Sequence, residues 1–462
     1  MHRLMPRGLR SACVLSVLAA TALAAPSMAG AAPGGEQCSG ANIEGQGASL
    51  QKLSQIETWS PAFNTSANAL ACAGTQGSKG KPTVTYHSVG SGKGLESFGQ
   101  EPKTEVVNYG PKNAYVGTDE PPNPTQKAEI ESHNGGKLLT IPVEQAAVTV
   151  SVHLPANCTI SGGPTPGRIA MKEATVEKIF EDTVTTWKQI LNGAKLAGVG
   201  CETKGTTPIK RVVRKDGSGT TSLFKKYLNV VFPKAIPTAE GKTWKQLAET
   251  AHNTTWPNEA GDPVIRGEGN GGVANEVAAN PGSVGYINLA DARKNGKFSP
   301  PLGGAGTSTF WVEVENGKIT VEGKKVSTYS DPSTNGDAEP KANSNCEETL
   351  YTNGKKKFPP PTAEEAWNEV STSKTEKNYV ICGFTYDLSL TKFSTVTGSL
   401  EAPTEGSVRS AYDYLNFVLA SGAGGGQTLI ANNVDYLGLP TSEEASKNVL
   451  KISREGVSKI GF

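Results

Sequence analysis

The sequence predicts an α/β protein, and three observations indicate this class. Strand-like and helix-like stretches alternate from about Ile43 onward, as in sheets covered by helices. Turns rich in glycine and hydroxyl residues separate several of these stretches, as in GQGASL, GSGKG and DGSGT. The chain has 462 residues, of which 53 are glycine. This length suffices for two or three domains with cores of their own.

The elements of the first half follow in chain order. GQGASL precedes a predicted helix, LQKLSQIETWSPAF, and PTVTYHSV alternates like a strand. GSGKG then leads into the helix-like LESF, and KNAYVGT is a short strand. The apolar run LLTIPVEQAAVTVSVHL predicts one or two buried strands. ATVEKIFEDTVTTWKQIL predicts a helix pair or one interrupted helix.

The second half continues the alternation. IKRVV and SLFKKYLNVVF predict a strand and a helix, and VANEVAAN and SVGYINLADA predict a helix and a strand. FWVEVENGKITVEG predicts a hairpin that turns at Asn316 and Gly317, because Asn-Gly is a preferred hairpin turn. SDPSTNGDAEPKANSN is polar and predicts a surface loop. VRSAYDYLNFVLAS and SEEASKNVLKISREGVSKI predict helices near the C-terminus.

The N-terminal residues predict export. Arg3, Arg7 and Arg10 precede the apolar run SACVLSVLAATALAA, and the small residues SMAGAA follow. This pattern predicts a signal peptide over residues 1–32 and a periplasmic or extracellular location. Cys38 stands in GEQC, without the small apolar residues that precede a lipid-modified cysteine, so we expect no lipid anchor.

Six of the seven cysteines lie beyond the predicted signal peptide. An even number in an exported chain predicts disulfides, although six cysteines allow 15 pairings. Pairing neighbours in order gives Cys38–Cys72, Cys158–Cys201 and Cys346–Cys382. Without its three early arginines, the chain has 42 basic residues against 44 acidic ones. A balance this even gives no reason to expect nucleic-acid or membrane-surface binding.

The stretch RKDGSGTTSLF, residues 214–224, places small hydroxyl residues and two opposite charges between a strand and a helix. One interpretation is a capped helix, in which a hydroxyl accepts from the first free amides. The other is an anion site, because a helix N-terminus and a guanidinium both attract oxyanions. GQGASLQKL and SVGSGKGLESF offer similar donors far away in the sequence. Three such loops favour a site that surrounds an anion from several sides.

The ordered motifs GQGASL, VGSGKGLESF, YVGTDEPP, VVRKDGSGTTSLF and GNGGVANEVAANPGSVGYI resemble those of phosphate-binding proteins. These are the extracytoplasmic receptors of ABC phosphate importers. The resemblance covers most of residues 43–290 and about 405–462. It implies a two-lobed type II periplasmic binding protein fold with the ligand in the cleft between the lobes. We expect one lobe over 41–142 and 377–462, and the other over 143–376 with an expanded insertion at about 292–376.

The resemblance also implies the site residues. Those expected to bind phosphate are Ser49, Leu50 through its backbone amide, Ser91, Asp119, Arg214, Ser218, Gly219 and Thr220. Asp216 is expected to support Arg214, which can offer two parallel N–H groups to an oxyanion. Asp119 discriminates between anions, because phosphate near neutral pH keeps a proton to donate and sulfate does not. Here Ser49 and Leu50 replace the family's usual Thr and aromatic residue.

The expected function is capture of inorganic phosphate by a monomeric receptor that delivers it to the membrane subunits of an ABC permease. We expect no catalysis, cofactor, metal or nucleic acid. One alternative is a secreted phosphate scavenger or sensor that is not coupled to a permease. A phosphatase is another, since this fold occurs in exported proteins with phosphatase activity. His87, His133, His153 and His252 are scattered, however, and no Gly-x-Ser-x-Gly elbow occurs. The third alternative is another oxyanion, such as sulfate, molybdate or an organophosphate, and Asp119 argues against the first two.

Overall fold

The protein is described here from a computed structural model. The residues that it describes are 33, 36–67, 69–72, 81–100, 114–156, 158, 169–193, 207–250, 252–298, 308–321, 324–333, 346, 350–352, 357–361, 367–368, 370–372, 379–393, 403–433 and 435–462. The predicted signal peptide, residues 1–32, lies outside them. No helix within these ranges combines the length and apolar character that a membrane crossing requires.

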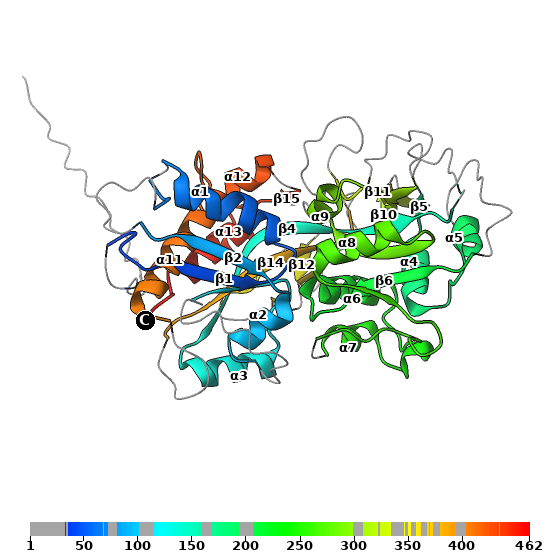
Figure 1. Ribbon diagram of the computed structural model, residues 1–462, viewed down its shortest axis with the longest axis horizontal. Helices are drawn as coiled ribbons and strands as arrows, with labels where there is room; N and C mark the ends of the chain where they lie inside the picture. The colour runs from blue at the N-terminus through cyan, green and yellow to red at the C-terminus, as the bar shows by residue number, and fades with distance from the viewer. Residues whose placement is uncertain are drawn as a thin grey trace, which may run out of the picture.

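Ten of the described strands form one mixed sheet that runs through two lobes lying side by side (Figure 1). Along the main path, neighbouring strands follow the order β2-β1-β3-β14-β4-β8-β6-β7, and β15 and β9 both pair with β4. These strands are β1 Ile43–Gly47, β2 Val84–Ser88, β3 Val116–Thr118, β4 Leu138–His153, β6 Lys210–Arg214, β7 Ile265–Gly267, β8 Ser283–Asn288, β9 Thr309–Trp311, β14 Cys382–Leu390 and β15 Tyr436–Leu437. The α/β class predicted from the sequence is therefore confirmed.

Helices cover each lobe. The first lobe carries η1 Ser54–Trp59, α1 Ser60–Thr65, α2 Ser91–Ser97, α3 Pro124–Asn134, α11 Glu405–Val418, α12 Gly426–Asn433, η3 Ala445–Lys447 and α13 Val449–Val457. The second carries α4 Glu173–Glu181, α5 Trp187–Gly193, α6 Gly219–Val231, η2 Pro237–Ala239, α7 Trp244–Ala248, α8 Gly269–Ala279 and α9 Leu289–Lys294.

Strand β4 joins the lobes. Residues 138–147 pair with β14 in the first lobe, and Val148–His153 pair with β8 in the second. All but the last residue of this 16-residue strand are buried, which explains the continuous apolar run in its sequence. The sequence allowed one strand or two here, and the structure has one. Around the motif RKDGSGTTSLF, the order of strand β6, loop and helix α6 is also as predicted.

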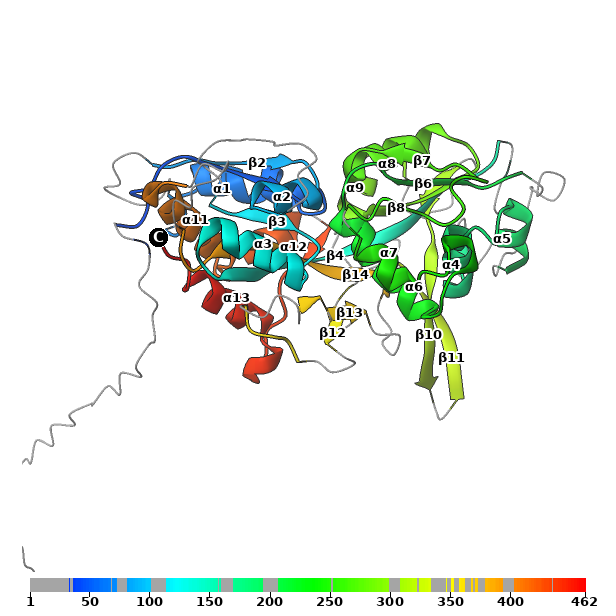
Figure 2. The ribbon, with the colours of Figure 1, turned by 90° about the horizontal axis from the view of Figure 1, so that it is seen from below.

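The predicted turn at Asn316 and Gly317 is wrong. Both residues lie inside β10 Glu313–Val321, which pairs with β11 Lys324–Ser330. The hairpin therefore turns after Val321, and its register shifts between Asn316 and Ile319. An extra residue accommodated within a strand lets an Asn-Gly pair remain in the ladder. The hairpin projects from the second lobe (Figure 2) and also pairs with β5 Ala170–Met171.

Other described residues of the insertion contact both lobes. Strand β12 Leu350–Thr352 pairs with β13 Val370–Thr372 next to the β4–β14 junction (Figure 2). Phe358 is tied to the first lobe, where its amide donates to the Ser446 carbonyl at 2.8 Å. Asn368 is tied to the second lobe, where its side-chain oxygen accepts from Lys226 Nζ at 2.7 Å. The segment thus bridges the two lobes.

Two of the predicted disulfides are confirmed. Cys38 is bonded to Cys72, and Cys346 is bonded to Cys382. Cys158 is also disulfide-bonded. Its predicted partner, Cys201, lies outside the described residues, so that pairing stays a prediction.

Candidate functional site

The loop between β6 and α6 places a guanidinium at the lobe interface. Arg214 is the last residue of β6, and its Nε donates to Asp216 Oδ1 at 2.8 Å, while Nη2 bonds the other oxygen of the same carboxylate. The amide of Gly269 adds a bond to Asp216 Oδ1 at 3.0 Å. Burial opposes the ionisation of Asp216, but the charge and hydrogen bonds of Arg214 outweigh it and lower the pKa of Asp216.

The third nitrogen of Arg214 has no hydrogen-bond partner among the described residues. Arg214 is 1% exposed, and its Nη1 is buried without a hydrogen bond to any described residue. A buried guanidinium N–H without an acceptor is costly, since charged donors lose strong hydration on burial. The guanidinium of Arg214 is therefore held by Asp216 through Nε and Nη2, and its Nη1 is available to an oxyanion.

The N-terminus of α6 has features of both a capped helix and an anion site, the two interpretations of its loop. Ser218 caps the helix, because its side-chain oxygen accepts from the Thr221 amide at 3.1 Å. The helix, thirteen residues long, also begins beside Arg214, and its first amides have no intrahelical acceptor. Phe224 stacks on Tyr286 with ring centroids 4.6 Å apart, and Tyr286 in turn bonds the Thr221 hydroxyl at 2.6 Å. The aromatic core of the second lobe thus fixes the loop.

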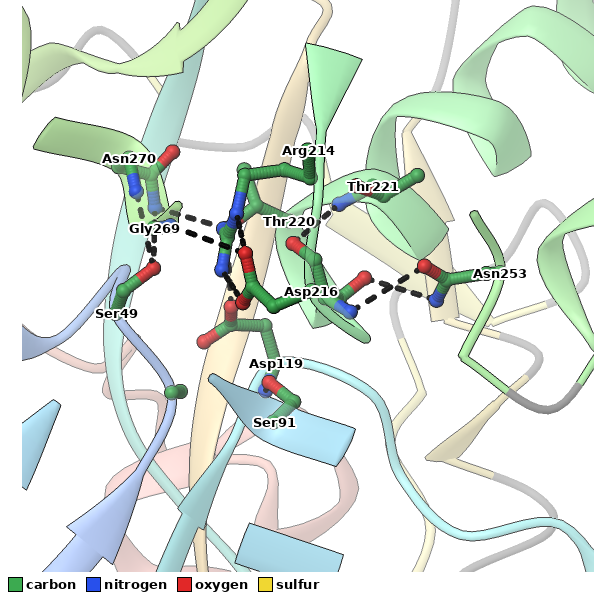
Figure 3. A network of polar contacts seen from close by, with 12 residues as sticks. Ser49, Ser91, Asp119, Arg214, Asp216, Thr220, Thr221, Asn253, Gly269 and Asn270 are labelled. Atoms are coloured by element: carbon green, nitrogen blue, oxygen red, sulfur yellow. Dashed lines mark hydrogen bonds and ion pairs between the residues drawn. The ribbon is translucent and has the colours of Figure 1, made fainter. Parts of the chain in front are cut away.

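Asp119 comes from the first lobe and reaches the same place (Figure 3). Its Oδ2 accepts from the Thr220 hydroxyl of the second lobe at 3.1 Å, and its Oδ1 accepts from the Thr385 hydroxyl at 2.8 Å. Burial raises the pKa of Asp119 to about 6, although the bonds from Thr385 and Thr220 and the charge of Arg214 lower it in part. Asp119 is therefore ionised at neutral pH.

Three serine hydroxyls of the lobe interface accept hydrogen bonds and keep a proton of their own. Ser49 Oγ accepts from Asn270 Nδ2 at 3.0 Å, and Ser91 Oγ accepts from the Asp119 amide at 3.2 Å. Ser218 Oγ accepts from the Thr221 amide, as described above. A hydroxyl has one proton, and none of these protons is used in a bond to a described residue. The serines are consequently available as donors.

The lobes approach closely at glycines. A Cβ added to Gly219 would lie 2.6 Å from Asp119 Cβ and 2.7 Å from Ser91 Oγ. Gly90 has a φ of +92°, and a Cβ there would lie 2.3 Å from Asp216 Oδ2. The Gly92 amide donates across the interface to the Gly217 carbonyl at 3.1 Å. Only glycine at these positions lets the two sets of loops meet.

The structure brings the predicted residues together. Seven of the eight residues expected to contact phosphate, together with Asp216, lie at this junction through the contacts given above: Ser49, Ser91, Asp119, Arg214, Ser218, Gly219 and Thr220. Leu50 is buried beside Ser49, and its carbonyl accepts from Asn288 Nδ2 at 2.7 Å and from the Tyr436 hydroxyl. Its expected use as an amide donor stays a prediction.

Three residues of the site were missed from the sequence. Asn270 links Ser49 to Thr220, and Asn253 binds both the amide and the carbonyl of Ser218. Thr385 holds Asp119 from β14, at a point where the register against β4 shifts. Asn270 stands in the GNGGVAN motif, which was a usable signal, whereas nothing marks Thr385 within its strand.

One cluster among the described residues has the composition of a metal site, namely Cys38, Cys72 and Asp413. Both sulfurs belong to a disulfide, and a disulfide sulfur is no thiolate ligand. We therefore assign no metal to it.

A two-lobed α/β fold with donor loops that converge at the lobe interface is the architecture of periplasmic binding proteins. The profile of the PBP superfamily domain matches residues 56–359. The chain belongs to the PBP superfamily.

Individual relatives are more distant. The phosphate-binding protein PstS of Xylella fastidiosa is 27% identical over 263 residues, which make up 57% of each chain. Alkaline phosphatase L of Pseudomonas aeruginosa is 28% identical over 207 residues, covering 44% of this chain and 49% of that protein. The chain thus aligns with a little over half the length of the first of these relatives and about half of the second.

Solved structures agree on the fold. The phosphate-binding protein PfluDING, bound with phosphate, superposes with a TM-score of 0.53 at 20% identity, covering 91% of this chain and 99% of that one. The phosphate-binding protein of Stenotrophomonas maltophilia gives 0.54 at 19% identity, with 90% and 93% covered.

Proposed function

We propose that the protein binds inorganic phosphate between its two lobes. The observation that carries this proposal is Nη1 of Arg214, a buried donor to which no residue in the described part of the chain offers an acceptor. The hydroxyls of Ser49 and Ser91 lie at the same lobe interface (Figure 3). Ser218 caps the N-terminus of α6 there, and its hydroxyl and the first amides of the helix can also donate. This is an environment rich in donors, as a tetrahedral oxyanion requires. The predicted contact of Leu50 through its backbone amide and the predicted contact of Gly219 complete the proposed shell.

Asp119 supports phosphate over other oxyanions. It is the acceptor among these donors, and it lies across the interface from the α6 loop. The monohydrogen and dihydrogen forms of phosphate can donate a proton to it. Sulfate would present only lone pairs, and two facing acceptors repel in a buried site. The same argument disfavours molybdate.

We further propose that the protein is an exported receptor that delivers phosphate to an ABC permease. The supporting observations are the predicted signal peptide, the disulfides, which form in oxidising compartments, and the similarity to phosphate-binding protein PstS. The expected lobes over 41–142 with 377–462 and over 143–376 remain part of this proposal. A secreted scavenger or sensor without a permease would use the same site.

A phosphatase is the second candidate, because of the similarity to alkaline phosphatase L. We propose binding without catalysis, since no described histidine or carboxylate is hydrogen-bonded to the hydroxyl of Ser218, the most nucleophile-like serine. Ser218 Oγ serves as a helix cap, and none of the histidines in the described ranges bonds to it. Hydrolysis of p-nitrophenyl phosphate above the level of an Arg214→Lys variant would contradict this.

The binding proposal is tested by calorimetry on protein that has been freed of phosphate by partial unfolding and dialysis. We expect binding to phosphate, and a 10- to 100-fold loss in Arg214→Lys, because lysine keeps the charge but not the two-armed geometry. Arg454→Lys is the matched control, since Arg454 is exposed and bonds the Leu419 carbonyl far from the site. No binding by the unaltered protein, or equal affinity of Arg214→Lys, would overturn the proposal.

A further inference from the structure

Asn270 touches both lobes from a fully buried position. It is the second residue of α8 in the second lobe and is 0% exposed. Its Nδ2 donates to Ser49 Oγ of the first lobe at 3.0 Å and to Thr220 Oγ1 of the second at 3.1 Å. We propose that Asn270 is a specificity-determining residue that sets the direction of the protons of Ser49 and Thr220. This inference rests on the proposed binding of phosphate.

A backbone group fixes the orientation of the Asn270 amide. The amide of Asn288 donates to Asn270 Oδ1 at 3.1 Å (the oxygen side of the group). A backbone N–H can only donate, so the oxygen of Asn270 must face Asn288 and the nitrogen must face the two hydroxyls. The two hydrogens on Nδ2 then serve Ser49 and Thr220. Neither hydroxyl can donate back to this nitrogen.

Ser49 is consequently compelled to donate elsewhere. Its Oγ accepts from Asn270 Nδ2 and also from the Asn270 backbone amide at 3.3 Å. A hydroxyl oxygen has two lone pairs, and both are filled by these bonds. No described residue accepts the remaining proton of Ser49. The proton is therefore directed at whatever anion Arg214 attracts.

Thr220 is directed at Asp119 in the same way. Because its oxygen accepts from Asn270, its proton goes to Asp119 Oδ2 at 3.1 Å. A second series of hydrogen bonds reaches the other carboxylate oxygen, Asp119 Oδ1. Gln51 Nε2 is fixed as a donor by the Tyr386 carbonyl at 3.2 Å and donates to Thr385 Oγ1 at 3.1 Å. Thr385 then donates to Asp119 Oδ1 at 2.8 Å, since this charged acceptor is nearer than the Thr118 carbonyl at 3.3 Å.

These two series of hydrogen bonds keep Asp119 in the role of an acceptor. A carboxylate with both oxygens receiving hydroxyl protons is stabilised in its ionised form and still has lone pairs left over. A ligand oxygen that meets Asp119 must then bring its own proton. Asn270 thus acts on selectivity through Thr220, and on affinity through Ser49. It is a positioning residue, since no role requires it to touch the anion.

The test compares phosphate and sulfate affinities, measured by calorimetry at pH 7.5, in variants of the full chain. We expect Asn270→Ala and Thr220→Val each to lower the phosphate-to-sulfate affinity ratio by at least tenfold. Thr220→Ser, which keeps the hydroxyl, is expected to retain the ratio. In the double variant with Asn270→Ala and Thr220→Val, the ratio should fall by much less than the product of the two single losses. Both substitutions interrupt the same series of hydrogen bonds from Asn270 through Thr220 to Asp119. Asn275→Ala is the control, an exposed asparagine on the same helix.

The outcomes separate this inference from the proposed function. Failure of the unaltered protein to bind phosphate rejects the function itself. Phosphate binding with an unchanged ratio in Asn270→Ala, or multiplicative losses in the double variant, rejects the role of Asn270 and leaves the function standing. If Asn270→Ala does not fold, Asn270→Asp replaces it, since it keeps the size and the acceptor for Asn288. A ratio in that variant equal to the unaltered protein's would overturn the inference as well.

Discussion

A carboxylate in an anion site discriminates only while it stays ionised and shielded from water. Asp119 meets both conditions, because it is 6% exposed and receives two hydroxyl protons. Its selectivity can be removed without changing its size. Asp119→Asn offers an N–H where the carboxylate offered a lone pair, so a sulfate oxygen no longer meets a like charge. We expect the preference for phosphate over sulfate to fall by about 2 kcal/mol, measured by competition calorimetry. An unchanged preference would contradict the role given to Asp119.

Individual site residues could be predicted from the sequence where they stand in a recognisable motif. Arg214, Asp216 and Ser218 stand in RKDGSGT, and the structure places them at one point. Thr385 and Asn253 carry no such signal. Thr385 reaches Asp119 because β14 shifts its register against β4 there, opposite a segment that contains Pro142. A local irregularity of pairing between two distant strands is a tertiary property, which single-sequence patterns do not contain.

The junction between the loops is an element-scale feature, and glycine makes it possible. Gly219, the first residue of α6, faces Asp119 and Ser91 across the interface. In Gly219→Ala the added methyl would push the first lobe away, at a cost of about 1–3 kcal/mol. We expect phosphate affinity to fall more than tenfold while thermal stability without ligand changes little, because the lobes can part without unfolding.

Gly422→Ala is the matched control for that change. Gly422 has open space around the position of its missing Cβ, so alanine is accommodated there. Equal phosphate affinities of the two variants would show that the lobes do not need this close approach.

The elements themselves were predicted well where one pattern dominated, as in β4 and α6. The hairpin of residues 313–330 shows where a local rule fails. Asn316 and Gly317 have the residues of a tight turn, yet β5 and β11 pair with the flanking residues and extend the strand past them. Pairing partners from elsewhere in the chain outweighed the turn preference of two residues.

The whole molecule carries buried carboxyl groups that link its stability to pH. Burial raises the pKa of Asp387 to about 8, although bonds from Gln51 and Gln55 lower it in part. The folded state therefore binds a proton more tightly than the unfolded state between about pH 4 and 8. Stability consequently falls as the pH rises through this window.

Between pH 5 and 7 we expect the free energy of unfolding of the phosphate-free protein to decrease with pH. Asp387→Asn should flatten this dependence by up to about 1.4 kcal/mol per pH unit, measured by denaturant titration at several pH values. Asp119, with its pKa raised to about 6, should leave a residual slope. An identical dependence in the variant would show that Asp387 is already ionised in the folded protein.

The two hydroxyls that hold Asp119 belong to different halves of the molecule. Thr385 sits in the same lobe as the carboxylate, whereas Thr220 comes from the other. When the two lobes separate, Asp119 loses its bond from Thr220 and becomes accessible to water. Water can then donate a hydrogen bond between Asp119 and any anion that enters. First encounters are then indiscriminate, and sorting between anions occurs only during closure. Discrimination against sulfate should therefore appear as a faster dissociation rate, whereas the association rates of sulfate and phosphate should hardly differ.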